Sequence, residues 1–241
     1  MTRVSITVDF EPDCPPYLSS TFRGIEEGAP ALLRLFAETG TRATYFTTGE
    51  VAKRYPAAVQ AVVDAGHELA CHGVTHTPFD TLDERTARWE IERSAEILRA
   101  TAPVTAFRAP NLRFPDRFLP LLEDNGFEID SSQAKYKRAY YAAAGSRPTT
   151  LTRIPASMTS SVIRLPRAIR DPWMLSLSDP VVLFVHPWEF VDLTREKLRY
   201  DCRFRTGPFA LEALREVIAL FRARGDHLLP MRELAQAARA A

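Results

Sequence analysis

The chain has 241 residues, of which 46% are hydrophobic and 25% are charged. These values are typical of a globular protein, and the length lies within the range of a single α/β barrel, so we expect one domain over residues 1–241. A total of 31 Lys and Arg against 30 Asp and Glu gives a net charge of +1, which excludes a bulk electrostatic attraction to nucleic acid or to an anionic membrane.

The three cysteines are an odd number without paired short spacing: Cys14, Cys71 and Cys202. This pattern argues against a disulfide framework and against a thiolate zinc site, and it favours a reducing compartment. The N-terminal residues lack the apolar core of a signal peptide, and no stretch reaches the ~20 apolar residues of a membrane span. We therefore expect a cytoplasmic protein without a transmembrane segment.

The first half of the chain alternates strands with helices. β-Branched or apolar runs predict strands at 4–8, 43–48, 67–71 and 105–107. Apolar residues at helical spacing predict helices at 28–40, 51–65 and 82–100. The last of these has a charged face that we expect to be solvated, formed by Glu84, Arg85, Arg88, Glu92, Arg93 and Glu96. This alternation is typical of a parallel α/β fold.

The pattern becomes weaker in the second half. A helix is expected at 118–125 and a strand at 127–129, whereas residues 133–180 lack clear periodicity and are expected to form irregular strands and substrate-side loops. The continuous apolar run 181–185 predicts a fully buried strand. Two further helices are expected, at about 210–224 and from Met231 onward.

Ligand-type side chains follow two of the early strands. Asp9, Glu11 and Asp13 follow the first strand, where carboxylates at the end of a parallel strand are functional candidates, although a turn rich in Asp and Pro would explain the same residues. His72 follows the third strand, and His76 lies four residues later. Two imidazoles at this spacing can converge on one metal ion, or they can be ordinary loop histidines.

The two histidines do not form the helical His-Glu-x-x-His motif of zinc proteases. Gly73 stands where that motif has Glu, and Gly73, Thr75 and Pro78 disfavour a helix. A strand end that runs into a loop fits these residues better.

Five strand ends read, in order, Asp9-Phe10-Glu11, His72-Gly73-Val74-Thr75-His76, Arg108-Ala109-Pro110, Asp130-Ser131-Ser132 and His186-Pro187-Trp188. This series resembles the five motifs of the polysaccharide deacetylase family, also called the NodB-homology family or carbohydrate esterase family four. The resemblance runs from Val4 to about Phe190. It implies a distorted (β/α)7 barrel and a hydrolase that removes an N-acyl group, most often acetyl, from an amino sugar.

The resemblance also implies a divalent metal site with the ligands Glu11, His72 and His76. Zinc suits two imidazoles and one carboxylate, and manganese, cobalt or iron remain open. Side chains two apart on a strand share a face, so Asp9 and Glu11 can both point to the ion, and Asp13 is close in sequence. The longer Glu11 is the expected ligand, with Asp9 beside it.

The remaining roles follow from the same resemblance. Asp9 would be the catalytic base, held by Arg108, and His186 would be the catalytic acid, oriented by Asp130. Asn111 stands where the family commonly has an aromatic residue, and its backbone N–H would contact the oxyanion.

Structural explanations remain for several of these residues. Arg108 and Asp130 could form an ion pair, and His186 could be a satisfied core histidine. Trp188 could bind substrate or pack as a wall of the site. His67 and Cys71 are expected to be structural.

Three functions therefore stay open. The first is a metal-dependent hydrolase acting on an amino sugar, a glycan, or a lipid-linked or nucleotide-linked sugar. The second is a metal-independent ureide or imide hydrolase of the same fold, and the third is a catalytically inactive carbohydrate-binding protein. The expected partner is a carbohydrate or amino-sugar substrate rather than nucleic acid, and the sequence leaves the oligomeric state open.

Overall fold

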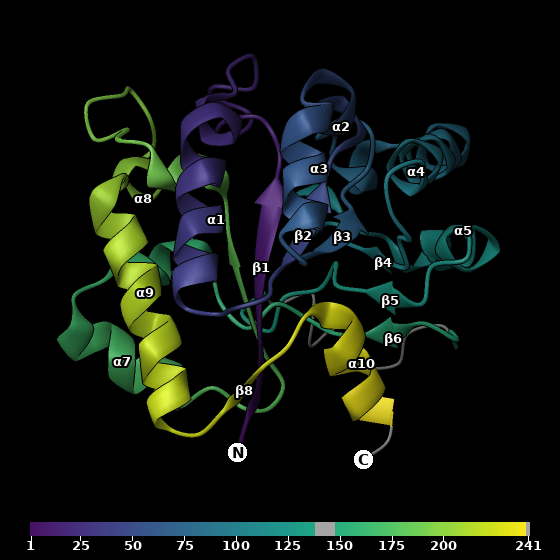
Figure 1. Cartoon of the computed structure of the whole chain (residues 1–241). Helices are drawn as coiled ribbons and strands as arrows, with labels where there is room; N and C mark the ends of the chain where they lie inside the picture. Colours follow the sequence, from purple (N-terminus) through teal and green to yellow (C-terminus); the bar gives the residue numbers. More distant parts are fainter. Residues whose placement is uncertain (138–147, 240–241) are drawn as a thin grey trace.

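The computed structural model of the protein describes residues 1–137 and 148–239. Its centre is a curved parallel sheet in the order β6-β5-β4-β3-β2-β1-β7, and β8 pairs with the start of β1. The strands are β1 (Arg3–Phe10), β2 (Thr44–Thr47), β3 (Glu68–Cys71), β4 (Ala106–Phe107), β5 (Ile129–Asp130), β6 (Thr152–Arg153), β7 (Val181–Val185) and β8 (His227–Leu228). Because the strands are parallel, all their carboxyl ends meet at one edge of the sheet; β1 runs toward that edge, upward in Figure 1.

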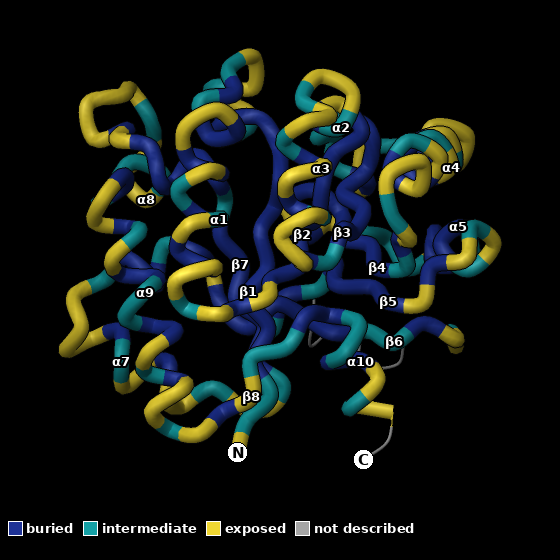
Figure 2. The backbone as a smooth tube through the Cα atoms, in the orientation of Figure 1, coloured by how far each residue is buried: buried dark blue, intermediate teal, exposed yellow. Residues whose placement is uncertain are grey.

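Helices surround the sheet (Figure 1). They are α1 (Ala29–Glu38), α2 (Gly49–Arg54), α3 (Pro56–Asp64), α4 (Glu84–Arg99), α5 (Leu119–Asp124), α7 (Arg167–Leu175), α8 (Tyr200–Arg203), α9 (Pro208–Ala223) and α10 (Met231–Arg239). Their outer faces are exposed, while β1, β2 and β7 between them are buried (Figure 2). This is the arrangement expected when a parallel sheet is covered by the helices that connect its strands.

The apolar core has two parts that follow the alternation of side chains along each strand. Val4, Ile6 and Val8 of β1 belong to the larger cluster, which also contains the buried faces of the surrounding helices. The opposite face of the sheet supplies a second cluster with Met231 and Leu234 of α10. The C-terminal helix therefore packs on the inner face of the curved sheet, and the carboxyl edge remains for other residues.

The barrel closes irregularly between β6 and β7. No strand ladder joins them among the described residues, but Ser157 approaches β7: its N–H donates to the Val182 carbonyl at 2.8 Å, and its Oγ accepts from the Val182 N–H at 2.9 Å. Seven strands from β6 to β7 and this loose seam give the distorted (β/α)7 barrel expected from the sequence, which is confirmed.

Two details of the expected elements are wrong. The helix expected at 51–65 is two helices, because Pro56 has no N–H to continue α2 and instead opens α3 at its first position. The second detail is α7, which lies within the expected loops of 133–180. Pro172 lies inside this helix, and the charged residue Arg170 occupies a buried position. The sequence of α7 therefore does not show the regular apolar spacing by which an amphipathic helix is recognised. Residues 138–147 of the same stretch lie outside the described residues.

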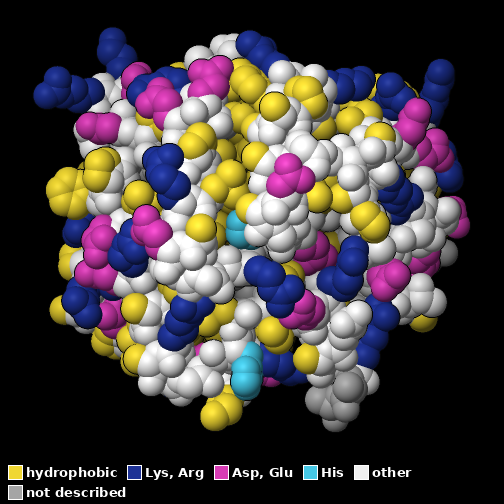
Figure 3. All heavy atoms as spheres, in the orientation of Figure 1, with side chains coloured by type: hydrophobic (Ala, Val, Ile, Leu, Met, Phe, Trp, Pro, Cys, Tyr) yellow, Lys and Arg dark blue, Asp and Glu magenta, His cyan; other side chains and the backbone are white. Residues whose placement is uncertain are grey.

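The surface carries both signs of charge. On the face shown in Figure 3, basic and acidic side chains are intermixed with apolar ones. Within the part of the chain that the structure describes, no helix combines the length and the apolar character needed to cross a bilayer.

Candidate active site

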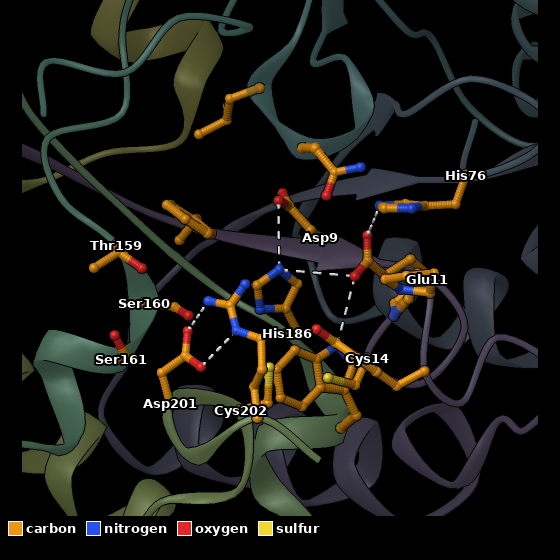
Figure 4. Close-up of a pocket in the computed structure, with 18 of the residues that line it drawn as sticks. Asp9, Glu11, Cys14, His76, Thr159, Ser160, Ser161, His186, Asp201 and Cys202 are labelled. Carbon is orange, nitrogen blue, oxygen red and sulfur yellow. Dashed lines mark hydrogen bonds and ion pairs between the residues drawn. The ribbon is translucent and has the colours of Figure 1, made fainter. Parts of the chain in front are cut away.

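The carboxyl ends of β1, β3, β4 and β7 carry the predicted site residues to one cavity of about 290 Å³. Parallel strands make this convergence a property of the fold. The predicted site residues that line the cavity are Asp9, Glu11, His76, Asn111, His186 and Trp188. Figure 4 shows Asp9, Glu11, His76 and His186 turned toward one another.

Glu11, His72 and His76 form a buried cluster. Glu11 Oε2 lies 2.6 Å from His76 Nε2 and 3.3 Å from His72 Nε2, and one ligand atom from each residue lies within 4.8 Å of the others. Burial opposes ionisation of Glu11, but His76 and His186 hold the pKa of its carboxyl well below the usual range. Although burial favours a neutral His76, the Glu11 carboxylate raises the pKa of that imidazole. One carboxylate and two imidazoles this close fit a divalent cation.

The tautomer of His72 suits a metal ligand. Its Nδ1 lies 2.7 Å from the Arg108 carbonyl oxygen, which can only accept a hydrogen bond, so Nδ1 carries the proton and donates. The lone pair of Nε2 is then directed toward Glu11 and His76. A backbone carbonyl behind a histidine ligand is a common way to fix the ring.

The loop between the two histidines is held by a glycine turn and by a residue of α4. Gly73 has a φ of +78°, a left-handed conformation that favours glycine. Glu90, on the buried face of α4, accepts hydrogen bonds from Val74 N at 2.6 Å, Thr75 N at 3.0 Å and Thr75 Oγ1 at 2.6 Å. The sequence motifs do not include Glu90, although a carboxylate on the apolar face of an amphipathic helix signals a buried polar contact.

Asp9 points to the same cavity but has a different partner. Its Oδ1 accepts from Arg108 Nη1 at 2.6 Å, and the guanidinium also donates to Thr7 Oγ1 and Ser131 Oγ. Arg108 is fully buried and stacks over Phe46, with 4.1 Å between its Cζ and the ring centroid. The arginine therefore fixes the orientation of the Asp9 side chain.

His186 lies opposite, at the end of β7. Its Nε2 is 3.7 Å from Glu11 Oε1 and 3.9 Å from Asp9 Oδ2, and its Nδ1 is 2.8 Å from Glu189 Oε1. Glu189 is buried and pairs with Arg164 at 3.0 Å. Burial favours the neutral ring, but Glu11 and then Glu189 raise the pKa of His186 to about 9. The imidazole can therefore carry a proton at neutral pH.

The expectation that Asp130 orients His186 is wrong. Asp130 Oδ2 pairs with Arg153 Nε at 3.0 Å and Oδ1 accepts from Ser132 N at 2.9 Å, while the His186 imidazole pairs with Glu189 instead. The physical reason is local: the turn after β7 brings residue 189 under residue 186, where the Glu189 carboxylate accepts both the backbone N–H and the ring of His186. Asp130 has a structural ion pair.

The two expected substrate contacts differ in exposure. Asn111 is exposed at the cavity, in a left-handed turn with a φ of +57°. Trp188 is buried, with its ring stacked on His186 at 4.8 Å between centroids and its Nε1 3.5 Å from Glu11 Oε1. Its packing favours the wall interpretation, while its presence in the cavity lining leaves a substrate contact open.

Three other residues have structural partners. Asp13, the third carboxylate after β1, accepts from Thr21 Oγ1, Arg23 N and Gly24 N, so it fixes the loop that follows rather than joining the metal cluster. His67 Nδ1 accepts from Ala43 N at 3.1 Å, and burial lowers its pKa to about 4. Cys71 is buried against Ser94.

Comparison with known proteins decides the family. The profile described as polysaccharide deacetylase matches residues 2–130, more than half of the chain. This chain belongs to the polysaccharide deacetylase family. The family resemblance predicted from the sequence is thereby confirmed.

Two relatives and one solved structure show how similar this chain is to known proteins. A peptidoglycan deacetylase-like protein of Gibberella zeae is 29% identical over 166 residues, covering 62% of this chain and 48% of the relative. A peptidoglycan deacetylase of Helicobacter pylori is 30% identical over 123 residues, covering 50% and 42%. The chain thus matches less than half the length of these relatives. A crystal structure described as a polysaccharide deacetylase from Mycobacterium smegmatis superposes on this chain with a TM-score of 0.73. The two sequences are 25% identical, and the match covers 99% of this chain and 90% of the other.

Proposed function

We propose that this chain is a divalent-metal-dependent hydrolase that removes an N-acyl group, acetyl in the first instance, from an amino sugar. One observation carries the proposal: the buried Glu11 carboxylate lies 2.6 Å from His76 on one side and 3.7 Å from His186 on the other. The candidate metal ligands and an imidazole that can carry a proton therefore lie together, and Asp9 lines the same cavity. Amide hydrolysis needs these groups together, because water must be activated and the amine must be protonated as it leaves.

Each residue around the cavity has a separate role in the proposed hydrolysis. A divalent ion held by Glu11, His72 and His76 would polarise the acyl carbonyl and lower the pKa of the attacking water. Asp9 accepts the proton of that water on Oδ2, because Oδ1 is bound to Arg108. The Asn111 N–H donates to the developing oxyanion. His186 Nε2 donates its proton to the nitrogen as the C–N bond breaks, which releases the carboxylic acid and a free amine.

The substrate is proposed at the level of class. The two relatives described above are named as a peptidoglycan deacetylase and a peptidoglycan deacetylase-like protein, so an N-acetylated amino-sugar polymer is the first candidate. Lipid-linked and nucleotide-linked amino sugars remain candidates with the same amide. The cytoplasmic location, which rests on the cysteine pattern, stays a prediction, as does the preference for zinc.

The proposal is tested by acetate release. Purified protein is incubated with N-acetylated chitooligosaccharides, peptidoglycan fragments and N-acetylated sugar nucleotides, before chelation, after chelation and after restoration with Zn²⁺, Mn²⁺ or Co²⁺. We expect release from at least one sugar, loss on chelation and recovery with metal. Release that continues in metal-free protein would overturn the metal mechanism and favour a ureide or imide hydrolase.

The inactive carbohydrate-binding protein is separated by a binding measurement. In that case the wild type would bind a glycan without acetate release, and an Asp9→Asn, His186→Ala double variant would bind it equally well. Under our proposal the wild type turns the bound sugar over, and the double variant retains it unhydrolysed.

A further inference from the structure

Two of the three cysteines meet at the cavity that holds the proposed catalytic residues. Cys14 lies three positions after Glu11, and Cys202 comes from α8 near the other end of the chain. Both line the cavity and both pack in one small apolar cluster with Trp188. Figure 4 labels both cysteines at this cavity, and each thiol is the main cause of the shift in the pKa of the other.

The backbone holds each thiol in place. Cys14 has a φ of +38°, which is uncommon for a residue with a side chain, and its carbonyl accepts from the Tyr17 N–H at 2.9 Å. On the other side, the buried Arg164 guanidinium donates to three carbonyl oxygens around α8, those of Asp201, Cys202 and Phe204. The meeting of the two sulfurs is therefore built into two anchored segments.

Cys71 provides a contrast within the same chain. It is fully buried in β3, and its Sγ lies 3.0 Å from Ser94 Oγ. Burial raises the pKa of its thiol to about 11. A structural cysteine of this protein thus lies in a closed environment, whereas Cys202 is only partly buried and lines an open cavity.

The two thiols of the cavity also differ from each other. Contact with the Cys14 thiol lowers the pKa of Cys202, while contact with Cys202, together with burial, raises the pKa of Cys14. A thiolate that is partly accessible and next to a second cysteine is the arrangement in which reversible thiol oxidation occurs.

We propose that Cys14 and Cys202 are an oxidation site that a hydroperoxide converts into an intramolecular disulfide. The Cys202 thiolate attacks one oxygen of the peroxide, an S–O bond forms, the O–O bond breaks and the alcohol or water leaves, so Cys202 becomes a sulfenic acid. The Cys14 sulfur then attacks the Cys202 sulfur, the S–S bond forms, and the hydroxide leaves with the Cys14 proton as water. Two thiols are oxidised by two electrons and one peroxide is reduced.

The bond would tie together two walls of the cavity. Pro15, Pro16 and Tyr17 follow Cys14 and line one wall, and Arg199 and Asp201 flank Cys202 on another. Thiol oxidation does not require amide hydrolysis. The two proposals can therefore be tested separately, and failure of one does not affect the other.

The test uses the reduced full-length protein and hydrogen peroxide, with intact mass, thiol titration and peptide mapping. Of the three cysteines, we expect one, Cys71, to remain a free thiol, and a Cys14–Cys202 peptide that dithiothreitol separates. In Cys14→Ser, a sulfenic-acid reagent should label Cys202; in Cys202→Ser, it should leave Cys14 unlabelled.

Several results would overturn the proposal. They are three free thiols at a peroxide dose that oxidises free glutathione, Cys202 overoxidised to a sulfinic acid without a disulfide, or a disulfide that includes Cys71. The decisive mapping is done on the wild type, so a serine variant that folds poorly does not affect it. Thermal unfolding adds a second readout: the oxidised wild type should unfold at a higher temperature than the reduced protein, since a cross-link restricts the unfolded chain.

Discussion

His72 and His186 lie at the ends of parallel strands, and both direct Nε2 toward the same carboxylate. The distances to Glu11 are 3.3 and 3.7 Å. They differ at Nδ1, where His72 meets the Arg108 carbonyl at 2.7 Å and His186 meets the Glu189 carboxylate at 2.8 Å. A neutral carbonyl fixes the tautomer of a neutral ring, whereas a carboxylate also favours the charged ring. The partner of the second nitrogen thus makes one histidine suited to bind a metal and the other suited to donate a proton.

The same contrast extends to the loops behind these histidines. Glu90 reaches the metal-side loop from α4 and binds backbone N–H groups, while Glu189 lies three residues from His186 and binds its imidazole directly. Glu90 therefore fixes the loop between His72 and His76, whereas Glu189 raises the pKa of His186. Variants can separate these two effects.

Among the carboxylate variants, the largest effect on turnover is expected for Asp9→Asn. The amide cannot accept the proton of the attacking water, so we expect kcat to fall by about 10³-fold, within the range of general base catalysis. Metal content, measured by elemental analysis, should stay at the wild-type value because Asp9 pairs with Arg108 and does not belong to the Glu11, His72 and His76 cluster.

Glu11→Gln is the matched control for this variant. It should weaken metal affinity, and excess metal should partly restore turnover. A result in which Asp9→Asn loses the metal and Glu11→Gln keeps it would reverse the roles assigned to the two carboxylates.

Glu189→Gln should lower kcat by about 10–100-fold, the range seen when an outer partner of a functional histidine is removed. Its carboxylate helps to raise the pKa of His186 to about 9, so its loss lowers that pKa. Because the acid must be protonated, the alkaline limb of the pH–rate profile should move to lower pH. An alkaline limb that stays in place would contradict this function of Glu189.

A smaller effect is expected for Glu90→Gln. Loss of the negative charge weakens the hydrogen bonds to Val74 and Thr75, so we expect metal affinity to fall by about 10-fold in calorimetry. The exposed Glu92 of the same helix offers a matched control, and Glu92→Gln should bind metal like the wild type. Equal affinity in the two variants would show that Glu90 does not support the metal-side loop.

The smallest effect on catalysis is expected for Asp130→Asn. Its partner is Arg153, so the pH–rate profile should stay where it is, in contrast to Glu189→Gln. Urea unfolding should show a loss of about 1–3 kcal/mol, because a buried charged hydrogen bond is weakened. A shift of the alkaline limb in this variant would restore the role that the family resemblance implied for Asp130.

The sequence predicted the parts of the site that depend on strand ends. Alternating strands and helices imply a parallel sheet, and a parallel sheet brings Glu11, His72 and His186 to one edge whatever the lengths of the connecting segments. The barrel and the cluster of these residues follow from that rule. The residues that hydrogen-bond to these side chains do not follow from that rule, because a side-chain pair depends on the exact path of a turn.

Glu189 and Glu90 show this limit in different ways. Glu189 directly follows the His186-Pro187-Trp188 motif, but a carboxylate three residues after the first residue of a turn is equally typical of a turn that caps its own backbone. Glu90 lies among charged neighbours in sequence, and only its place on the buried face of α4 reveals its role. The Cys14–Cys202 contact joins distant segments, and no spacing in the sequence signals it.

The most direct test of the contrast between the histidines is a calorimetric titration of Zn²⁺ into metal-free protein, comparing the wild type with His76→Ala and His186→Ala. Both variants should lose turnover. The account predicts that His76→Ala loses more than the roughly 10–100-fold in affinity that removal of an outer partner gives, while His186→Ala binds zinc as the wild type does. Undiminished affinity in His76→Ala, or an equal loss in both variants, would contradict the division between a metal-binding side and a proton-donating side.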